Sequence, residues 1–394
     1  MVPLKLLLSR LIRQGTLTVI DPNGRAETYG TPPGLSSTIR LHDPRMVWQM
    51  LRDPTLAVGE GYMDGTLTVE EGDILNFLNL VAINAGRATD ESYFHLGAGR
   101  LVRGIRRANN RRRARANVAT HYEFTTEFYD LFLDANRQYS CGYFRDKTDT
   151  LEQAQLNKLD HVAKKLLLEP RHRVLDIGCG WGGLARHINA VSGAHVTGIT
   201  LAEEQCRAAR EMAVAEGKED ALDFRVEDYR RIGGPFDRIV SVGMFEHVGV
   251  ARYEKYFRRI RELLTDDGIA MVHTIGRDDG PGATDAWTER YIFPGGYSPA
   301  LSEIMPAIER SGLHISDIEV WRVHYGRTAH AWYDRFQRNR EKVKALYDER
   351  FCRMFELFLA GCVGSFHWGG LVVFQMQLGR KVDSVPLTRD YLYR

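Results

Sequence analysis

The chain has 394 residues, of which 44% are hydrophobic and 26% are charged, and its formal net charge is +2. This composition is that of an ordinary soluble globular protein, and it excludes a repetitive or low-complexity chain. The length exceeds what one compact core usually needs, so we expect two domains, or one large domain with an extension.

Five cysteines are scattered along the chain, with no C-x-x-C pair among them. Their odd number and spacing argue against a disulfide framework and fit a reducing, cytoplasmic location. No apolar run reaches the ~18 residues that a membrane-spanning helix needs, and the nearest run, Ile74–Ala85, is interrupted by asparagines. We therefore expect a protein that does not cross a membrane.

The first 95 residues (1–95) are expected to form a small α+β domain. Leucines recur at helical spacing over Leu4–Leu11, and Pro22–Gly24 is a hairpin turn between two strand-like segments. We expect helices over Asp43–Arg52 and Ile74–Ala85, with strand-like alternation over Gly59–Val69. Because this region holds no cluster of titratable residues, we assign it a binding or docking role.

Residues 96–120 are expected to form a basic linker, in which Arg100–Arg115 contains eight arginines and no acidic residue. Such a run is either a solvated helix face or a contact with an anionic surface. Lipid is favoured over nucleic acid, because no aromatic residues alternate with the arginines to stack on bases. Each arginine near an anionic bilayer contributes ~1 kcal/mol, so the run predicts peripheral membrane contact and no nucleic-acid partner.

Strand-like and helical segments alternate along residues 121–394, which predicts a parallel sheet with helices on both faces. A helix ending near Glu169 precedes the first strand, and further helices begin near Glu203 and Arg252. The expected strands after the first one are His195–Ile199, Leu222–Val226, Asp237–Val242, Gly268–Ile275, His314–Val323 and Leu371–Leu378. The last two are expected to close the sheet as an antiparallel pair.

The first strand of this region leads into the turn Val174–Gly183, which reads V-L-D-I-G-C-G-W-G-G. An apolar run followed by four glycines predicts a buried strand that turns sharply into a helix and lets the backbone approach a nucleotide-like ligand. Its G-x-G-x-x-G spacing is shared with dinucleotide-binding folds. A nicotinamide cofactor is therefore one alternative, and a turn without a ligand is another.

Two features favour S-adenosylmethionine over a dinucleotide. Asp176 precedes the first glycine by two residues, where its carboxylate is suited to a sulfonium and an amino group. The second strand ends in Thr200–Leu201, without the acidic residue that binds a ribose diol in dinucleotide enzymes. The ligand of an open α/β sheet lies beyond the carboxyl ends of its strands. We therefore expect Gln205 at the ribose, Asp228 at the adenine amino group and Tyr229 stacked on the base.

Six motifs, in order along the chain, carry a resemblance to a known family. They are Y-S-C-G-Y-F from Tyr139, V-L-D-I-G-C-G-W-G-G from Val174, V-T-G-I-T-L-A-E-E-Q from Val196, M-F-E-H-V-G from Met244, Y-I-F-P-G-G-Y-S-P from Tyr291 and H-Y-G-R-T-A-H-A-W from His324. Over His121–Gln377 the chain resembles the cyclopropane-fatty-acyl-phospholipid synthase family, including its mycolic acid relatives. The resemblance implies a seven-stranded Rossmann-like class I methyltransferase that uses S-adenosylmethionine to alkylate double bonds in the acyl chains of membrane phospholipids. It also implies that the N-terminal domain binds lipid.

The resemblance assigns roles to individual residues. It implies that the cofactor is contacted by Tyr139, Ser140, Gly178, Gly180, Thr200, Leu201 and Gln205. It implies a bound bicarbonate ion held by Cys141, Glu246, His273, Ile275 and Tyr325, with Cys362 as a catalytic cysteine. The bicarbonate acts as the base that removes a proton from the transferred methyl, so that a cyclopropane ring closes.

Each of these side chains also has a structural alternative. His273 is then a hydrogen-bonded core histidine, Glu246 a helix cap and Tyr325 a packing residue. Cys141 and Cys362 are then small buried hydrophobic residues. A metal site is not expected, because no His/Cys pair has metal-ligand spacing.

We therefore expect a cytoplasmic enzyme, peripheral on the inner membrane surface, that converts cis-unsaturated acyl chains of phospholipids into cyclopropane chains. Over His121–Glu127 the sequence H-Y-E-F-T-T-E departs from the family's H-Y-D-x-G-N-D, so an enzyme that yields a methyl-branched or otherwise unsaturated chain is an alternative. A methyltransferase of a small soluble molecule and a catalytically inactive lipid-binding protein are further alternatives. The oligomeric state stays open, with a homodimer as one option.

Overall fold

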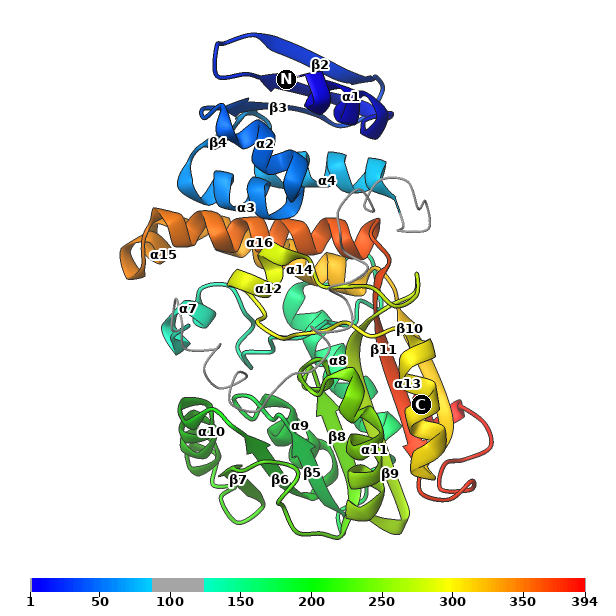
Figure 1. Cartoon of the computed structure of the whole chain (residues 1–394). Coiled ribbons are helices and arrows are strands. Elements are labelled where there is room, and N and C mark those ends of the chain that lie inside the picture. The colour runs from blue at the N-terminus through cyan, green and yellow to red at the C-terminus, as the bar shows by residue number, and fades with distance from the viewer. Residues whose placement is uncertain (1, 87–123, 394) are drawn as a thin grey trace. The chain divides into compact units, whose positions relative to one another are not determined.

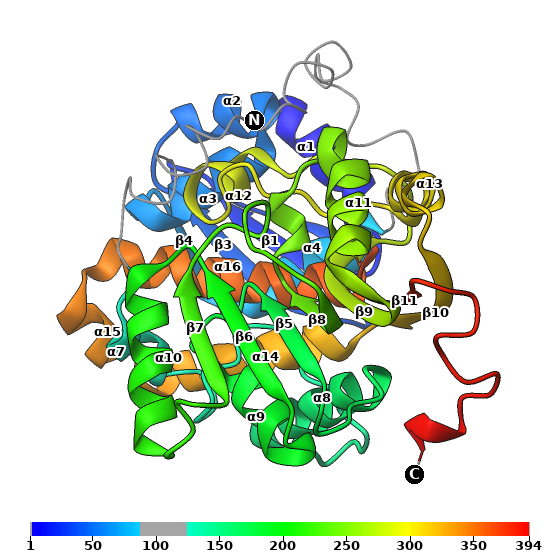
Figure 2. The same cartoon turned by 90° about the horizontal axis from the view of Figure 1, so that it is seen from below.

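A computed structural model describes residues 2–86 and 124–393, and the chain folds into two units (Figures 1 and 2). Unit 1 consists of Met1–Phe132, Gly282–Gly296 and Tyr325–Leu371, and unit 2 of Leu133–Pro281, Tyr297–His324 and Val372–Arg394. Each unit therefore joins segments that are far apart in the sequence. The predicted segments 1–95, 96–120 and 121–394 are consecutive and do not coincide with these units, and the arginine-rich run lies outside the described residues.

Unit 1 begins with helix α1 (Val2–Leu11), followed by a four-stranded sheet of order β2-β1-β3-β4. The strands are β1 (Gly15–Ile20), β2 (Ala26–Thr31), β3 (Ser36–Leu41) and β4 (Leu67–Glu71). As expected, Pro22–Gly24 lies in the turn between the antiparallel pair β1 and β2. Leu17 and Val19 of β1 are buried, which is the alternation of a sheet with one covered face.

Three helices complete the N-terminal part of unit 1. They are α2 (Arg45–Arg52), α3 (Pro54–Asp64) and α4 (Ile74–Ala85). The predicted helix over Ile74–Ala85 is confirmed, and the one over Asp43–Arg52 is confirmed from Arg45 onward.

The strand-like alternation predicted for Gly59–Val69 is wrong over most of its length, because these residues continue helix α3 up to Asp64. Asp53 caps the helix by accepting a hydrogen bond from a backbone amide of the first turn, and Pro54 takes the first helical position. Gly65 ends the helix with a φ of 74°. These start and stop signals outweigh the alternation that suggested a strand.

The rest of unit 1 is built mainly from helices. They are α7 (Thr126–Asp130), α12 (Ala286–Tyr291), α14 (His324–Arg338), α15 (Arg340–Leu346) and α16 (Glu349–His367). Helix α16 packs against α3 and α4. Phe128 contacts the rings of Phe132, Phe351 and Phe355. These contacts hold helices from both ends of the chain in one unit, which the sequence patterns do not indicate.

Unit 2 contains a seven-stranded sheet of order β10-β11-β9-β8-β5-β6-β7. The strands are β5 (Arg173–Ile177), β6 (His195–Thr200), β7 (Leu222–Val226), β8 (Phe236–Val242), β9 (Leu264–Arg277), β10 (His314–Trp321) and β11 (Leu371–Gly379). Strands β5 to β9 run parallel, whereas β10 and β11 form the predicted antiparallel pair. Each strand expected in this region is therefore present, close to its predicted bounds.

Five long helices flank the sheet of unit 2. They are α8 (Leu151–Lys165), α9 (Gly183–Ser192), α10 (Glu203–Ala215), α11 (Tyr253–Leu263) and α13 (Leu301–Ser311). The first three cover one face and the last two cover the other (Figure 2). Val174 and Met271 pack toward α8, α9 and α10, whereas Leu175 packs toward α11 and α13. Because strand residues alternate between faces, Asp176 and His273 belong to the α8 side. The predicted seven-stranded Rossmann-like fold is confirmed.

The end of α3 offers a test of this local structure. Gly65→Ala places a methyl group on a residue with a φ of 74°, so we expect the free energy of unfolding to fall by about 1 kcal/mol. Urea denaturation followed by fluorescence measures this change. Gly233→Ala is the matched control, because Gly233 has no positive φ and a Cβ there meets no atom within 4 Å. An equal loss in both variants contradicts the assignment of α3.

Candidate active site

The glycine-rich turn after β5 forms a cradle of backbone. Gly178, Gly180 and Gly182 have φ values of 86°, 54° and 78°, which residues with side chains rarely adopt. The amides of Gly178 and Cys179 both donate to the Ile199 carbonyl, at 2.8 and 3.0 Å, and so tie the turn to β6. A Cβ on Gly180 meets no atom within 4 Å, so this part of the turn borders open space. The cradle therefore leaves room for a ligand.

Asp176 lies near the end of β5, and its side chain is buried. Its Oδ2 has no hydrogen-bond partner within the described residues. Burial raises the pKa of Asp176 to about 7, and Lys158 opposes that rise. A buried carboxylate oxygen without a donor fits a positively charged group of a ligand, such as the sulfonium or the amino group of S-adenosylmethionine.

The residues predicted to contact the ribose lie after β6. Thr200 Oγ1 donates to Gln205 Oε1 at 3.0 Å, and this contact orients the Gln205 amide with its nitrogen as the remaining donor. Leu201 between them is exposed. An oriented amide donor at a strand end suits a ribose hydroxyl.

The residues predicted to contact the adenine lie after β7. The Asp228 carboxylate pairs with the guanidinium of Arg230. Tyr229 packs edge-on against Tyr256, with ring centroids 5.4 Å apart. An adenine amino group must therefore share Asp228 with Arg230, and the adenine roles of Asp228 and Tyr229 stay predictions.

Tyr139, Ser140 and Cys141 lie in an irregular segment before α8, as the sequence indicates. Two α8 side chains hold this segment: Gln155 Nε2 donates to the Ser140 carbonyl at 2.9 Å, and Lys158 Nζ donates to Ser140 Oγ at 3.0 Å. Cys141 is fully buried, and its sulfur lies 3.3 Å from the next carbonyl oxygen. The charge of Lys158 also lowers the pKa of Asp176 at the end of β5. The segment with Ser140 and the glycine cradle therefore belong to one site.

Glu246 is buried in the short 3-10 helix η1 (Phe245–His247) after β8. Its Oε1 accepts a hydrogen bond from the Ile275 amide at 2.7 Å, and its Oε2 has no partner in the described part of the chain. Burial raises the pKa of Glu246 to about 7. The carboxylate thus binds the end of β9 rather than capping a helix. Ile275 enters the site as the partner that orients Glu246.

His273 on β9 is buried, and Gln375 Nε2 lies 3.1 Å from its Nδ1. Burial, together with Lys158 and Lys165, lowers the pKa of His273 to about 3, so the ring is neutral at physiological pH. With Gln375 as the donor, Nδ1 accepts and Nε2 carries the proton. His273 is therefore a neutral donor and not a base.

Near His273, the half-buried Glu319 and the buried His161 and Lys165 form a polar network that the sequence analysis does not identify. Glu319 on β10 accepts hydrogen bonds from His161 and Lys165 of α8, each at 2.6 Å. Although burial opposes it, the hydrogen bond from His161 and the charge of Lys165 lower the pKa of Glu319 to about 2. Trp321 packs edge-on against the His273 ring, with centroids 5.3 Å apart. The network stabilises the walls around His273 without supplying a free base.

Helix α8 is expected from the sequence only as a linking helix, yet it buries a stripe of polar side chains. They are Gln155, Lys158, His161 and Lys165. Polar residues three and four positions apart usually form the solvated face of a helix, so one sequence gives no signal that this stripe faces inward. Gln375 is missed for a similar reason, because it alternates with apolar residues along β11.

Tyr325 and Cys362 belong to unit 1, whereas Cys141, Glu246, His273 and Ile275 belong to unit 2. The Tyr325 ring lies 4.6 Å from that of Phe366. Burial raises the pKa of the Cys362 thiol to about 12, so the thiol is protonated at physiological pH. The Cys362 side chain is only partly covered, so this protonation state argues against a thiolate nucleophile but does not make the residue part of the buried core. The catalytic roles of both residues stay predictions.

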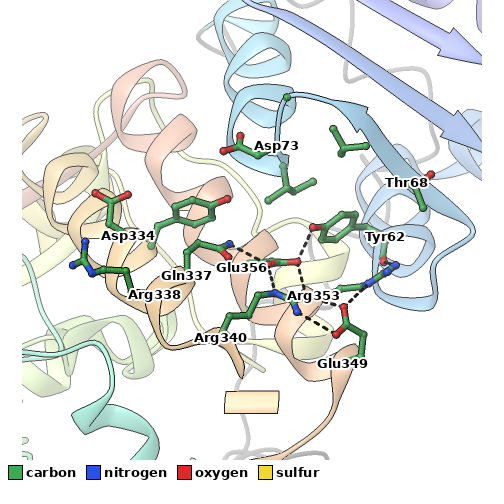
Figure 3. Close-up of a pocket in the computed structure, with 14 residues that line it drawn as sticks. Tyr62, Thr68, Asp73, Asp334, Gln337, Arg338, Arg340, Glu349, Arg353 and Glu356 are labelled. Atoms are coloured by element: carbon green, nitrogen blue, oxygen red, sulfur yellow. Dashed lines mark hydrogen bonds and ion pairs between the residues drawn. The ribbon is translucent and has the colours of Figure 1, made fainter. Parts of the chain in front are cut away.

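The cavity shown in Figure 3 lies in unit 1 and is lined by none of the predicted site residues. Its volume is about 750 Å³. Charged and polar side chains in its wall bind one another: Glu356 accepts hydrogen bonds from Tyr62 at 2.6 Å and from Gln337 and Arg340 at 3.0 Å (Figure 3). This network joins α3 to α14, α15 and α16 and explains the buried carboxylate without a ligand.

Residues 2–86 and 124–393 contain no group of three or more His, Cys, Asp or Glu side chains arranged to hold a metal ion. The same ranges contain no helix with the length and apolar character needed to span a membrane.

The sheet order, the glycine cradle and the buried Asp176 define a class I S-adenosylmethionine-dependent methyltransferase. A family model described as mycolic acid cyclopropane synthetase matches residues 109–376, and a domain of unknown function, DUF7884, matches residues 4–92. The chain therefore belongs to the mycolic acid cyclopropane synthetase family, and the resemblance found in its motifs is confirmed.

Similarity to members of this family extends over most of the chain. The chain is 36% identical over 375 residues to a probable fatty acid methyltransferase of Pseudomonas putida, covering 92% of this chain and 93% of that protein. It is 36% identical over 350 residues to the cyclopropane-fatty-acyl-phospholipid synthase of Escherichia coli K12, covering 88% of each. The solved structure of mycolic acid cyclopropane synthase CmaA1 complexed with SAH and CTAB matches with a TM-score of 0.63 and 29% identity, over 67% of this chain and 97% of that one.

The raised pKa of Glu246 predicts a pH-dependent stability. Its folded-state value of about 7 exceeds the ordinary value of 4.5, so the folded protein binds the proton more tightly and loses stability as the pH rises between these values. The ionised carboxylate then costs about 3 kcal/mol. Glu246→Gln keeps the acceptor for the Ile275 amide and removes the charge. At pH values well above 7 we therefore expect the variant to have a higher melting temperature than the wild type.

Thermal unfolding across this pH range measures the effect. At low pH, where the wild-type carboxyl is protonated, the two proteins should melt together. Glu262→Gln is the control, because Glu262 is an exposed carboxylate in unit 2. A gain in Glu246→Gln that is the same at every pH contradicts the raised pKa.

Proposed function

We propose that this protein transfers a methylene group from S-adenosylmethionine to the cis double bond of unsaturated phospholipid acyl chains, forming cyclopropane fatty acids. The observation that carries the proposal is that Glu246, just after β8, and His273, on β9 opposite the last residue of β8, are both buried in the same unit as the glycine cradle. Each side chain is held by a hydrogen bond, from Ile275 and from Gln375, and each keeps one further atom for a ligand, Glu246 Oε2 and His273 Nε2. The name of the Escherichia coli relative supports the substrate class.

The chemistry explains why such a site suits an alkene. When bound, S-adenosylmethionine supplies an electrophilic methyl group, whose bond to sulfur breaks as a bond to one alkene carbon forms and leaves positive charge on the other. A proton must then leave the transferred methyl before the ring closes, and a weak base about 3 Å away is enough. Water must be excluded, because it would capture the cation. The burial of Glu246 and His273 meets this requirement.

We propose bicarbonate as this base. His273 would donate to it through Nε2–H, since Nδ1 accepts from Gln375. Glu246 Oε2, which has no partner among the described residues, would accept the hydroxyl hydrogen of the anion. Cys141, Ile275 and Tyr325 are assigned to the same anion by the family resemblance. Held there by His273 and Glu246, a small anion would stabilise the positive charge on the alkene carbon and could accept the proton of the transferred methyl.

A methyl-branched or otherwise unsaturated product is the second candidate. The Pseudomonas putida relative, whose name is probable fatty acid methyltransferase, matches a larger share of the chain than the Escherichia coli relative does. The two reactions share the methyl transfer and differ in which proton leaves. A catalytically inactive lipid-binding protein is disfavoured, because the cradle, Asp176, Glu246 and His273 are all in place.

One assay tests the proposed reaction. Purified protein is incubated with isotopically labelled S-adenosylmethionine and vesicles of a dioleoyl phospholipid, with and without added bicarbonate, and the fatty acids are analysed by mass spectrometry. We expect each modified chain to gain one CH₂ and to lose its double bond, and turnover to fall when bicarbonate and dissolved CO₂ are removed. A modified chain that keeps a double bond or carries a methyl branch favours the second candidate.

His273→Ala is the matched variant for this assay. Loss of the neutral donor should lower turnover by about 100-fold or more, while cofactor binding measured by calorimetry stays close to that of the wild type. Equal losses of turnover and binding make His273 a structural residue. Absence of any labelled lipid with the wild-type protein favours an inactive lipid-binding protein.

We propose that the protein works in the cytoplasm as a peripheral protein of the inner membrane surface, and helix α2 supports this. Arg45, Trp48 and Arg52 share one face of the helix and are exposed, with 71% of Trp48 accessible. The opposite face, with Met46, Val47 and Met50, is buried. An exposed tryptophan between arginines is typical of helices that lie at an anionic bilayer surface.

This contact is tested with vesicles that contain phosphatidylglycerol. Because each arginine contributes ~1 kcal/mol near such a surface, Arg45→Ala/Arg52→Ala should weaken binding about 10-fold or more, and binding by the wild type should weaken as salt rises. Trp48→Ala should weaken it further. Arg207→Ala/Arg258→Ala, which removes two exposed helical arginines of unit 2, is the control. Unchanged binding by the α2 variants contradicts the proposal.

A further inference from the structure

Lys158 is a fully buried lysine whose direct partners are neutral. Its Nζ donates to Gln138 Oε1 and to Ser140 Oγ, and its side chain is 0% exposed. Asp134 and Asp176 act on it through their charges, but no carboxylate of the described residues forms an ion pair with it. Burial lowers the pKa of Lys158 to about 8, so the ammonium is still mostly protonated at physiological pH. A buried positive charge with only neutral direct partners suits a ligand that brings a negative one.

The position of the segment before α8 does not depend on Lys158 alone. The backbone N–H of Gln138 donates to Asp134 Oδ1 at 2.8 Å, and Gln155 Nε2 donates to the Ser140 carbonyl at 2.9 Å. What Lys158 adds is its charge and a proton donated to the Ser140 hydroxyl oxygen. Since that oxygen already accepts from Lys158, the hydroxyl proton of Ser140 is available for another acceptor, and no described residue accepts it.

The strand order indicates which part of the cofactor lies near Lys158. Strands β5, β6 and β7 are consecutive neighbours in the sheet, and the residues expected at the ribose and adenine follow β6 and β7. This leaves the end of β5, with Asp176, for the methionine part. A Cβ on Gly183 would overlap the Gln138 side chain, so the segment before α8 also contacts the start of α9 beside this strand end.

The methionine part of S-adenosylmethionine carries an ammonium and a carboxylate at neutral pH. Asp176, with its unpartnered Oδ2, matches the ammonium. Lys158 and the hydroxyl proton of Ser140 match the carboxylate. The site therefore presents one negative and one positive charge to a ligand group that carries one of each.

We propose that Lys158 is a positioning residue for the cofactor. Lys158 acts through the Ser140 hydroxyl, which holds the carboxylate of the methionine moiety. The inference rests on the proposed function only in taking S-adenosylmethionine as the cofactor. It is independent of the lipid substrate, the anion and the product.

Calorimetry with two ligands tests this role. S-Adenosylhomocysteine carries the methionine-derived carboxylate, whereas 5′-methylthioadenosine shares its adenosine and sulfur but lacks the amino acid. Lys158→Met keeps the length and burial of the side chain and removes its charge. We expect it to weaken S-adenosylhomocysteine about 10- to 100-fold and to leave methylthioadenosine within about twofold. Equal weakening of both ligands, or no weakening of S-adenosylhomocysteine, overturns the proposal.

Two further variants separate positioning from packing. Gln155→Leu removes a clamp on the same segment without removing charge, so the ratio of the two affinities should stay near that of the wild type. Ser140→Ala should lower the affinity for S-adenosylhomocysteine alone, and it tests the proposal even where Lys158→Met does not fold. In the double variant Lys158→Met/Ser140→Ala, the loss of binding free energy for S-adenosylhomocysteine should be smaller than the sum of the two single losses, because both residues act on one carboxylate. Full additivity in the cycle contradicts an action through Ser140.

Discussion

The burial of charge between α8 and the sheet is the constraint on which unit 2 depends. A buried ion costs several kcal/mol unless hydrogen bonds and an opposite charge compensate for it. Along α8, Lys165 meets this requirement through Glu319, and Lys158 meets part of it through Gln138 and Ser140. These partners lie on β10 and in the segment before the helix. Helix α8 thereby fixes the position of β10 and of the segment that precedes the helix through directional polar contacts, which apolar packing alone does not supply.

The same polar layer determines the chemistry available at the strand ends. Asp176 and Glu246 are carboxyl groups whose pKa values rise to about 7, and His273 is an imidazole whose pKa falls to about 3. All three shifts have burial as their largest cause, and all three disfavour the charged form. At physiological pH His273 is therefore neutral and the two carboxyl groups are only partly ionised, whereas Lys158 stays mostly protonated. Because burial disfavours the charged forms of these three side chains, a bound ligand contributes much of the charge in the site, which suits a sulfonium cofactor and a small anion.

Features that depend on local sequence were predictable, and features that depend on distant contacts were not. The strands of unit 2 and the turn at Gly178–Gly183 follow from apolar runs and glycines that are adjacent in sequence. The error at Gly59–Val69 arose because a helix with small buried residues, such as Gly59 and Gly61, mimics the alternation of a strand. His161, Lys165 and Gln375 need partners more than a hundred residues away, for example the 102-residue separation of Gln375 and His273. Gln155 and Lys158 have nearer partners, but these lie in an irregular segment without periodicity. Hydrophobic periodicity is a local pattern, so it does not indicate a partner so distant in sequence.

The pairing of His273 with Gln375 has a consequence for how the reaction cycle ends. His273 Nδ1 accepts a hydrogen bond and Nε2 keeps its hydrogen, so the neutral ring does not take up a second proton. The hydrogen ion lost from the substrate in the proposed reaction would then pass to a small anion, which must release it to solvent before the next turnover. In that case the rate of the proposed reaction would depend on the supply of that small anion around the protein.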